Sequence, residues 1–320
     1  MQVKAKARNG ASGTRNRAVL GQLSDMDLRL LKVFKSVVDC GGMAAAELEL
    51  NIGTSTVSRH VKDLETRLGL VLCRRGRAGF ALTAEGQRVY DETLRLLASV
   101  DAFRGSIDDI HNRMGGQLDV ALFDKTATNP QARIGEAIAR FTEIAPEVRL
   151  AVHVGSINAI EQGVLEGNFQ IGIIPAHRAS KSLVYADLFD ETMLLYCGAG
   201  HPLFGVSHDK LTWARLREHH FAGLGYHSPN MELSHRAKLS RMATGFDQEA
   251  IATLILSGRF LGFLPDHYGR IFEEQGRMRP VRKQLFRYGC GFVCVMRRSP
   301  APSRAALAFK EALLQAHGVG

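Results

Sequence analysis

Residues 44–68 read AAAELELNIGTSTVSRHVKDLETRL, and this stretch predicts two short helices joined by a tight turn. The first helix spans residues 43–50, and its alanines let a neighbouring helix approach closely. The Asn-Ile-Gly sequence of residues 51–53 forms the turn. The second helix begins at Thr54 or Ser55, with Val57, Val61 and Leu64 on one face. Its other face is polar, a pattern typical of a helix that enters the major groove of B-DNA.

The flanking sequence extends this pair of helices into a domain. Ser24 and Asp27 are spaced as a capping box, and they predict a preceding helix that ends at the Cys-Gly-Gly sequence of residues 40–42. Apolar runs at residues 70–73 and 80–82 bracket the basic, glycine-containing segment 74–79, which predicts a hairpin. We therefore expect residues 23–83 to form a winged helix-turn-helix domain.

The side chains expected to contact DNA are short hydroxyls and cations on the second helix and the wing. Arg59 is the candidate for a base or phosphate contact, the hydroxyls for base edges, and the wing arginines for the phosphate backbone. The full set is Thr54, Ser55, Thr56, Ser58, Arg59, Lys62, Arg75 and Arg77.

Charge is concentrated at the front of the chain. Residues 1–80 contain 14 Lys and Arg against 7 Asp and Glu, and residues 81–320 contain 27 against 25. Such a distribution is the electrostatic footprint of a nucleic-acid-binding module. Residues 1–22 carry five cations and no acid, so we interpret them as a flexible basic arm that either adds phosphate contacts or is a passive tail.

The same arm lacks the apolar core of a signal peptide, and no segment approaches the about 20 apolar residues of a membrane span. The five cysteines are widely spaced and odd in number, which does not indicate a disulfide framework. We therefore expect a cytoplasmic protein that does not enter membranes.

Residues 84–112 predict one long helix, followed by a linker that ends at residue 114. Seven residues along it follow a heptad spacing that suits pairing with a second copy of the chain. They are Val89, Thr93, Leu96, Val100, Phe103, Ile107 and Ile110. A homodimer is the favoured interpretation, and a helix packed on its own chain's core is the alternative.

From residue 115 onwards, strands alternate with helices, which predicts an α/β domain with a parallel sheet. We expect strands at 118–123, 148–154 and 170–174 and helices at 132–144 and 159–167. A second such region has strands at 192–197, 221–224 and 261–264, a helix at 247–257, an extended segment at 285–296 and a closing helix at 302–316.

The front of the chain resembles the LysR-type transcriptional regulators. The matching features are Val57-Ser58-Arg59, Leu64-Glu65, Leu68-Gly69 and the LTAEG sequence of residues 82–86, together with Ala45 and Ala46. The HPL sequence at 201–203 and the GRFLGFLP sequence at 258–265 also occur where that family has them. The sequence departs from the family at Gly53 and Thr54, where Ser-Gln is usual, and at Met43, where Phe is usual.

The resemblance implies an α/β chain with an all-α winged helix-turn-helix domain and a two-lobed, periplasmic-binding-protein-like effector domain at residues 115–320. Lobe I would comprise about residues 117–190 and 290–320, and lobe II about residues 191–289. A small effector, a carboxylate or zwitterion, would lie between the lobes, near the carboxyl ends of the strands. The resemblance also implies a homotetramer, and RNA polymerase is a further candidate partner.

The residues expected near the effector lie in the loops at those strand ends. They are Asp124, Lys125, Thr126, Thr128, Asn129, Ser156, Asn158, His177, Tyr226 and Thr244. Several precede helix N-termini, where free amides suit an anion, but helix capping is an equal explanation. Asp124 and Lys125 could contact an ammonium and a carboxylate, which points to a zwitterionic or cationic effector, and a surface ion pair is the alternative.

We expect no metal and no cofactor. The histidines at 219, 220, 227 and 235 cluster in sequence, but their spacing matches no tetrahedral site. Phosphate-loop, nucleotide-fingerprint and hydrolase motifs are absent from the sequence. The prediction is therefore a sequence-specific transcriptional regulator controlled by an effector, and not an enzyme. An enzyme with an accessory DNA-binding domain is the alternative, and salt-dependent, sequence-specific DNA binding would distinguish the two. An architectural DNA protein ranks last, since it has no use for two α/β lobes.

Overall fold

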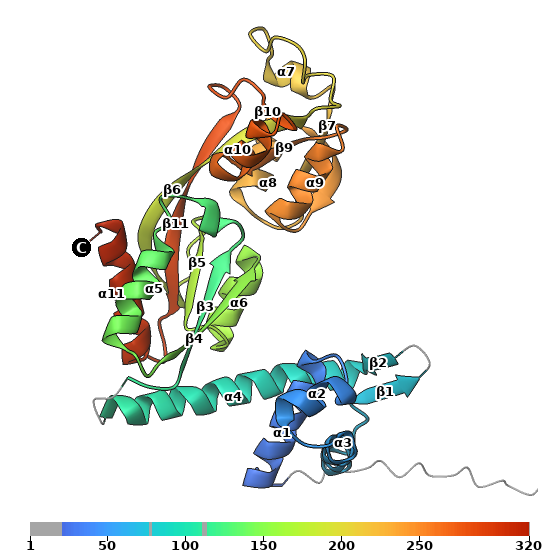
Figure 1. Ribbon diagram of the computed structural model, residues 1–320, viewed down its shortest axis with the longest axis vertical. Coiled ribbons are helices and arrows are strands. Elements are labelled where there is room, and N and C mark those ends of the chain that lie inside the picture. The colour runs from blue at the N-terminus through green and yellow to red at the C-terminus, as the bar shows by residue number, and fades with distance from the viewer. Residues whose placement is uncertain (1–20, 77–78, 111–113, 320) are drawn as a thin grey trace, which may run out of the picture. The chain divides into compact units, whose positions relative to one another are not determined.

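A computed structural model describes residues 21–76, 79–110 and 114–319 of the chain (Figure 1). The chain divides into two compact units, Met1–Leu97 and Ala98–Gly320. Because the description begins at residue 21, the predicted basic arm of residues 1–22 lies almost wholly outside the described residues.

The first unit contains α1 (Asp25–Asp39), α2 (Met43–Leu50) and α3 (Thr54–Leu68), followed by the strands β1 (Cys73–Gly76) and β2 (Gly79–Leu82). The capping box at the start of α1 is confirmed, because Ser24 and Asp27 bond each other's backbone amides. Asn51, in the left-handed conformation, turns the chain between α2 and α3, and Gly69 at φ +66° ends α3.

Apolar faces of the three helices form the core of this unit. Val57, Val61 and Leu64 of α3 are almost fully buried, as their spacing predicted. They belong to two clusters that also contain Val37 and Phe34 of α1. Ala46 of α2 is fully buried, which agrees with the close helix approach expected from the alanine-rich sequence, and Met43 fills the place expected for Phe.

The hairpin is fixed to α3 and to the start of α4 by side-chain bonds. Glu65 Oε1 accepts from the amide of Leu72 at 2.8 Å, and the Thr83 hydroxyl donates to the Val71 carbonyl at 2.6 Å. Thr83 Oγ1 also accepts from the amide of Gly86 at 2.8 Å, which caps α4. These bonds explain the Leu-Glu and Leu-Thr-Ala-Glu-Gly parts of the sequence signature.

The long helix α4 (Ala84–Ile110) is present as predicted, but its heptad residues divide into two groups. Val89 and Leu96 pack against the core of the first unit, and Thr93 is buried. Phe103 and Ile107, further along, are exposed. The first half of the helix therefore packs on its own chain, as the alternative interpretation held, and only the second half presents apolar side chains to solvent.

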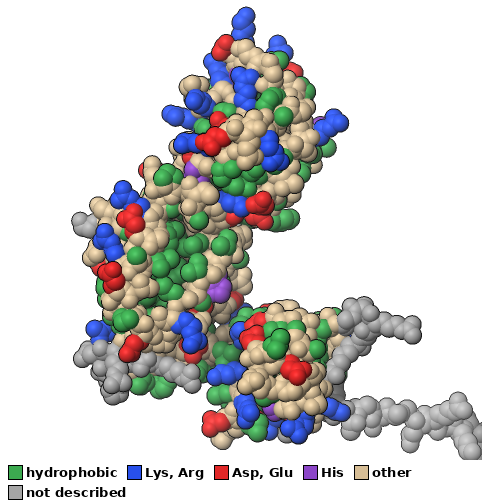
Figure 2. All heavy atoms as spheres, viewed as in Figure 1, with side chains coloured by type: hydrophobic (Ala, Val, Ile, Leu, Met, Phe, Trp, Pro, Cys, Tyr) green, Lys and Arg blue, Asp and Glu red, His purple; other side chains and the backbone are tan. Residues whose placement is uncertain are grey.

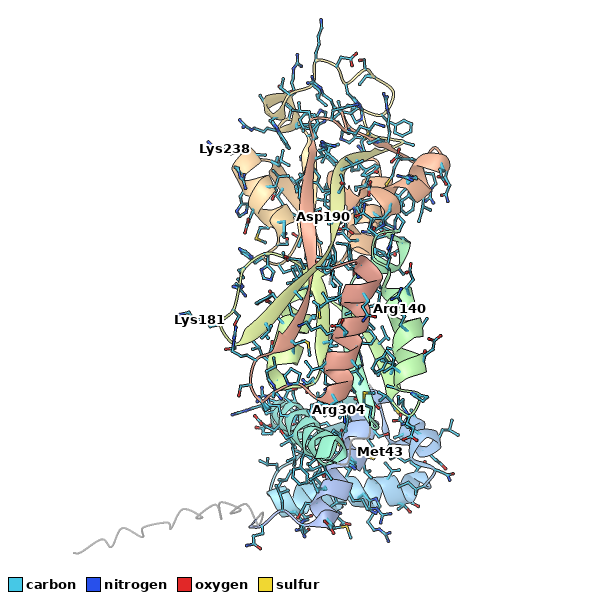
Figure 3. All side chains as sticks on the ribbon, turned by 90° about the vertical axis from the view of Figure 1, so that its left-hand side faces the viewer. Met43, Arg140, Lys181, Asp190, Lys238 and Arg304 are labelled. Atoms are coloured by element: carbon cyan, nitrogen blue, oxygen red, sulfur yellow. The ribbon has the colours of Figure 1, made fainter. Side chains whose placement is uncertain are left out.

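Lobe I of the second unit is a three-strand parallel sheet covered by helices. Its strands are β3 (Gln117–Phe123), β4 (Arg149–Gly155) and β5 (Ile171–Pro175), with β3 between the other two. A 3-10 turn, η1 (Thr126–Thr128), follows β3. The helices are α5 (Ile134–Ile144), α6 (Ile157–Glu166) and the closing α11 (Arg304–His317). Arg140 projects outward from α5 (Figure 3).

Lobe II repeats this arrangement with β7 (His220–Leu224), β8 (Ser240–Gly245) and β9 (Leu261–Pro265), in which β7 pairs in parallel with both neighbours. Its helices are α7 (Trp213–Leu216), α8 (Pro229–Ala237), α9 (Gln248–Leu256) and α10 (Asp266–Glu274), and a short strand β10 (Met278–Pro280) pairs with β6. The sequence prediction missed α7, α8, β8, α10 and β10.

Two long antiparallel strands join the lobes. They are β6 (Leu183–Gly198) and β11 (Arg287–Arg297), and they lie at the centre of one continuous sheet with the order β4-β3-β5-β11-β6-β9-β7-β8. The sheet is therefore mixed, not purely parallel as expected. Asp190 lies on β6 where that strand passes from one lobe to the other (Figure 3), and its neighbour Glu191 pairs with Cys290 of β11.

Candidate DNA-binding helix and interlobe cavity

The solvent-facing side of α3 carries three of the predicted DNA contacts. Ser55, Arg59 and Lys62 are exposed at helical spacing, opposite the buried face of the helix. Lys and Arg are also the most frequent charged side chains on the visible face of the first unit (Figure 2). Because the helix is held by its apolar face, these side chains are free to approach a ligand without unfolding the domain.

The other predicted DNA contacts are less accessible or lie outside the described residues. Thr54, Thr56 and Ser58 are half-buried, and the Thr54 hydroxyl donates to the Glu47 carboxylate of α2. Arg77 and the side chain of Arg75 lie outside the described residues. Gly53 precedes α3 and offers no side chain to cap its first amides.

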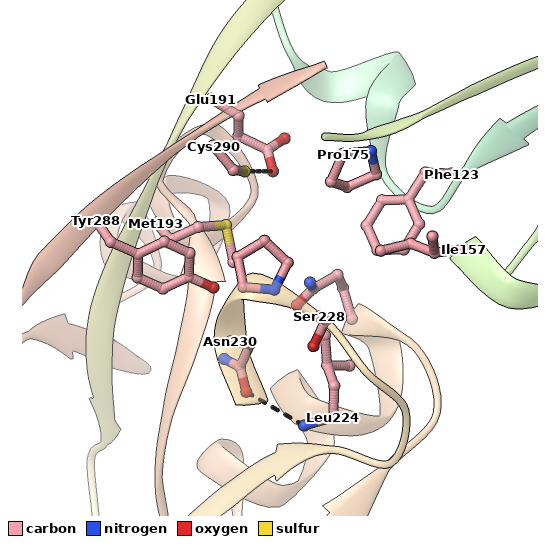
Figure 4. Close-up of a pocket in the computed structure, with 12 residues that line it drawn as sticks. Phe123, Ile157, Pro175, Glu191, Met193, Leu224, Ser228, Asn230, Tyr288 and Cys290 are labelled. Carbon is pink, nitrogen blue, oxygen red and sulfur yellow. Dashed lines mark hydrogen bonds between the residues drawn. The ribbon is translucent and has the colours of Figure 1, made fainter. Parts of the chain in front are cut away.

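In the second unit, a small cavity lies where the two lobes and the joining strands meet (Figure 4). Its volume is about 20 Å³, enough for one water-sized group. The lining is mostly apolar. It comprises Phe123, Ile157 and Pro175 from lobe I, Leu224, Ser228, Pro229, Asn230 and Gln248 from lobe II, and Glu191, Met193, Tyr288 and Cys290 from β6 and β11.

Glu191 is the buried carboxylate of this cavity. Its side chain is only 2% exposed, and Oε1 accepts from Nε2 of His267 at 2.9 Å. The thiol of Cys290 approaches the other oxygen at 3.9 Å, and Figure 4 shows this contact at the edge of the cavity. Burial, with the negative charge of Glu191 beside it, raises the pKa of the Cys290 thiol, which therefore remains neutral.

Other polar groups of the cavity belong to lobe II. Asn230 Oδ1 accepts from the amide of Leu224 at 3.3 Å, which fixes the start of α8 against β7. Gln248 is 2% exposed, and its Oε1 has no hydrogen-bond partner. A buried amide oxygen without a donor costs free energy, so this atom is a candidate to bind a ligand.

Three of the predicted effector residues make polar contacts between the lobes. Lys125 pairs with Glu249 of α9 and lowers the pKa of that carboxyl. Asp124 Oδ2 accepts from the amide of Gln248 at 2.7 Å. Thr128 Oγ1 lies 2.8 Å from Nδ1 of His267, the ring that also bonds Glu191. The pairing of Asp124 with Lys125, at 3.6 Å, is thus one part of a network that spans both lobes.

Four more predicted residues belong to turns and helix starts in lobe I. Thr126 and Asn129 are buried, and Asn129 Oδ1 accepts from the amide of Gln131 while its Nδ2 has no partner. Ser156 caps α6 through the amide of Ala159, and Asn158 is exposed on the same helix.

The last three predicted residues lie around the lobe boundary. The buried His177 side chain lies 3.2 Å from Glu161, and desolvation lowers its pKa. Tyr226 is buried with no partner for its hydroxyl, and Thr244 is exposed on β8.

None of the ten predicted effector residues lines the cavity itself. The predicted residues lie in loops next to the cavity, whereas neighbouring side chains such as Phe123 and Pro175 line it. The prediction did not include Glu191, Met193, Tyr288 and Cys290, because these residues lie on the strands β6 and β11 and not in the loops at strand ends. An acidic residue inside an apolar, strand-like run was the available signal for Glu191.

The described residues contain neither a group of metal ligands nor a helix that could span a membrane. No three His, Cys, Asp or Glu side chains within residues 21–76, 79–110 and 114–319 are grouped to hold a metal ion. Within the same ranges, no helix has both the length and the apolar character needed to cross a membrane.

Comparisons with known proteins agree with both halves of the chain. Residues 28–87 match the bacterial regulatory helix-turn-helix protein of the lysR family, and residues 111–318 match the LysR substrate binding domain. This chain belongs to the LysR family of transcriptional regulators. It is therefore a DNA-binding transcriptional regulator with a substrate-binding effector domain.

Relatives of this LysR-type regulator match over most of their length. The HTH-type transcriptional activator BauR of Pseudomonas aeruginosa is 37% identical over 294 residues, which cover 92% of this chain and 96% of BauR. The crystal structure of CbnR, a LysR family transcriptional regulator, matches 91% of this chain and 99% of its own with a TM-score of 0.61 at 19% identity. Full-length CbnR complexed with its target DNA matches with a TM-score of 0.58 at 20% identity, over 90% of this chain and 99% of its own. These two structures show the shared fold.

Proposed function

We propose that this regulator reads its operator with α3 and that a small molecule in the interlobe cavity controls it. The exposed row of Ser55, Arg59 and Lys62 on a helix held by its apolar face is the observation that carries the DNA-binding part. Arg59 contacts a base or a phosphate, Ser55 contacts a base edge, and Lys62 contacts the backbone.

The start of α3 supports a phosphate contact as well. Gly53 leaves the first amides of α3 without a side-chain cap, and the positive end of a helix dipole attracts an anion. Thr54 is already bonded to Glu47, so it reads a base only through its methyl group or a remaining lone pair. Thr56 and Ser58 lie beside the row and complete the predicted contact surface, together with the arginines of the wing.

The regulator acts as a homo-oligomer. Phe103 and Ile107 of α4 are exposed apolar side chains at heptad spacing, which a second copy of the helix would cover. Pairing places two copies of α3 on two half-sites of a pseudo-palindrome, and pairs of dimers form a tetramer. The protein acts on DNA in the cytoplasm, with RNA polymerase as a further partner, and it does not act as an enzyme.

The test of the DNA-binding part is a gel-shift titration on the DNA upstream of the protein's own gene. Arg59→Ala should weaken specific binding by about tenfold or more, since a lost base contact costs about 1–3 kcal/mol. Arg140→Ala removes the same charge from the outer face of α5 and is the matched control. Unchanged affinity of the Arg59 variant would remove this residue from the interface.

A salt titration separates the two roles of Arg59. If it contacts a phosphate, the slope of log affinity against log salt decreases by about one in the variant, and random DNA weakens equally. If it contacts a base, the specific-over-random ratio decreases and the slope is unchanged. Absence of any specific-over-random ratio in the wild-type protein would contradict the operator-reading proposal.

A further inference from the structure

The interlobe cavity has an unusual charge for a chain of formal net charge +9. No lysine or arginine lines it, and its ionisable side chains are Glu191, Tyr288 and Cys290. Burial raises the pKa of both the Tyr288 hydroxyl and the Cys290 thiol, so these two groups are neutral. Glu191 is therefore the one carboxyl among the described residues that line the cavity.

The surroundings of the cavity add further negative charge. Asp124 and Glu249 lie where the lobes meet, and Asp247 caps α9 next to the lining residue Gln248. Two cations lie at this place: Lys125, which is bound by Glu249 with Asp124 3.6 Å away, and Arg241, which donates to the Leu224 carbonyl at 2.6 Å. Carboxylates thus outnumber cations, and the local field favours a positively charged ligand.

At the starts of α8 and α9, some backbone amides already bond oxygens of the chain itself. The amide of Gln248 donates to Asp124, and that of Ala250 donates to Asp247. At the start of α8, the Met231 amide donates to Ser228. The chain's own oxygens already occupy these donors, so an effector carboxylate would have to displace them.

Glu191 itself has unused acceptor capacity. Oε1 accepts from His267, while Oε2 faces only the Cys290 thiol, a weak donor, at 3.9 Å. His267 is shared with lobe I, since its Nδ1 lies 2.8 Å from the Thr128 hydroxyl. A buried carboxyl oxygen that faces only a weak donor is costly, so a ligand that brings a charged donor to Oε2 would be favoured there.

A second, independent observation points to a donor-bearing ligand. Gln248 Oε1 is a buried acceptor without a partner, and Gln248 lines the same cavity as Glu191. An ammonium group has three donors and no acceptor, so its chemistry matches acceptors of this kind. The remaining walls, including Phe123, Ile157 and Leu224, are apolar. The cavity of about 20 Å³ has room for the ammonium group, and the carbon chain attached to it would need the lobes to separate further.

We propose that the effector of this regulator is a small aliphatic amine, whose ammonium group binds Glu191 and Gln248 between the lobes. This inference rests on the proposed function, in which the interlobe cavity is the effector site. A carboxylate elsewhere on the molecule is compatible with the proposal, whereas a carboxylate in place of the amine is not.

The test is a thermal-shift titration of the full-length protein with matched compounds of two to six carbons. Each set contains an alkylamine, an ω-amino acid, the corresponding fatty acid and the ω-hydroxy acid. We expect at least one amine or amino acid to raise the melting temperature with the logarithm of its concentration, and the two compounds without an amine to have no effect at about 10 mM. No shift from any amine in the series would overturn the proposal.

Variants assign the effect to Glu191. Glu191→Gln keeps the size and one acceptor but removes the charge, and it should weaken the amine response by about tenfold or more. Glu191→Asp retains the charge and should retain part of the response, which separates charge from folding. Glu274→Gln, on the exposed side of α10, is the matched control. An amine response unchanged in Glu191→Gln would contradict the proposal.

A third variant tests the amine inference separately from the proposed function, in which the interlobe cavity is the effector site. Cys290→Met extends a lining side chain into the cavity and should block any compound that binds there. If a carboxylate without an amine raises the melting temperature and Cys290→Met abolishes the effect, the effector cavity stands and the amine inference is overturned. If an active compound is unaffected by both Cys290→Met and Glu191→Gln, the proposed effector cavity fails as well.

Discussion

A single buried carboxylate, Asp27, joins two helices of the DNA-binding unit. It bonds the amide and hydroxyl of Ser24 at the start of α1, and Nη2 of Arg67 in α3 donates to it at 2.9 Å. The Arg67 guanidinium, followed by Ser24, lowers the pKa of the Asp27 carboxyl to about 2. This residue therefore fixes the position of α3, the helix proposed to read DNA, relative to the rest of the unit.

We predict that Asp27→Asn destabilises this unit at neutral pH and much less in acid. The lowered pKa means that the carboxylate stabilises the folded state above the unfolded pKa of about 4, and that this contribution is lost as the pH falls towards 2. Hydrogen exchange of peptides from residues 24–68 should be faster in the variant at pH 7, with the difference narrowing at lower pH. The control is Asp25→Asn, because Asp25 lies two residues earlier in the same helix and is exposed. Equal effects of the two substitutions on hydrogen exchange would contradict the prediction.

Gly86 is required by a close backbone approach near the start of α4. A Cβ atom added there would lie 1.9 Å from the carbonyl oxygen of Leu72. Gly86→Ala should therefore destabilise the first unit by about 1–3 kcal/mol, against the usual gain from alanine in a helix. Gly105→Ala on the same helix meets nothing closer than 3.9 Å, and it should be neutral or stabilising. Urea unfolding of both variants, followed by circular dichroism, checks this, and a stable Gly86→Ala protein would refute it.

At the scale of elements, the two halves of α4 differ in their surroundings. Its first half packs on the core of the DNA-binding unit through Val89 and Leu96, and its second half exposes Phe103 at 67%. Phe103→Glu should shift the protein towards monomers in sedimentation velocity, because burying the new charge at a helix pair is costly. Phe246→Glu, at a 69% exposed position outside α4, should leave the association state unchanged. An oligomer that survives Phe103→Glu would exclude this surface from the dimer interface.

Sequence patterns predicted the elements that have one apolar face and strong end signals. Helix α3 was predicted from its start to Leu68 because its valines recur at helical spacing and Gly69 follows. Strand β6 was predicted only at residues 192–197, although it spans 16 residues. Acidic residues interrupt its first half, and they are tolerated because pairing with β11 fixes the backbone there. Glu191 was missed for this reason, since its burial depends on β11 and α10, which are distant in sequence.

At the scale of the whole effector domain, the lobes are held together by polar contacts near the cavity. The pair between Lys125 and Glu249 is partly exposed, so breaking it should change the free energy of unfolding by less than about 1 kcal/mol. Its larger effect should be local: in Lys125→Met, the amide of Gln248 should exchange faster as the lobes separate more often. Lys181→Met, on an exposed loop of lobe I, is the control. Equal exchange in both variants would show that the lobes are joined by other contacts.

The two joining strands also determine how such a protein can be rebuilt. The chain leaves lobe I along β6 and returns along β11, and Glu191 lies directly opposite Cys290 on the shared ladder. Residues 192–289 therefore form a cassette whose two ends are neighbours, inserted in a lobe that is otherwise complete. Transplanting this cassette from a relative requires only two adjacent junctions, both far from α3 in sequence. New ligand specificity could thus be acquired by exchange of one segment, while the operator that the protein reads stays the same.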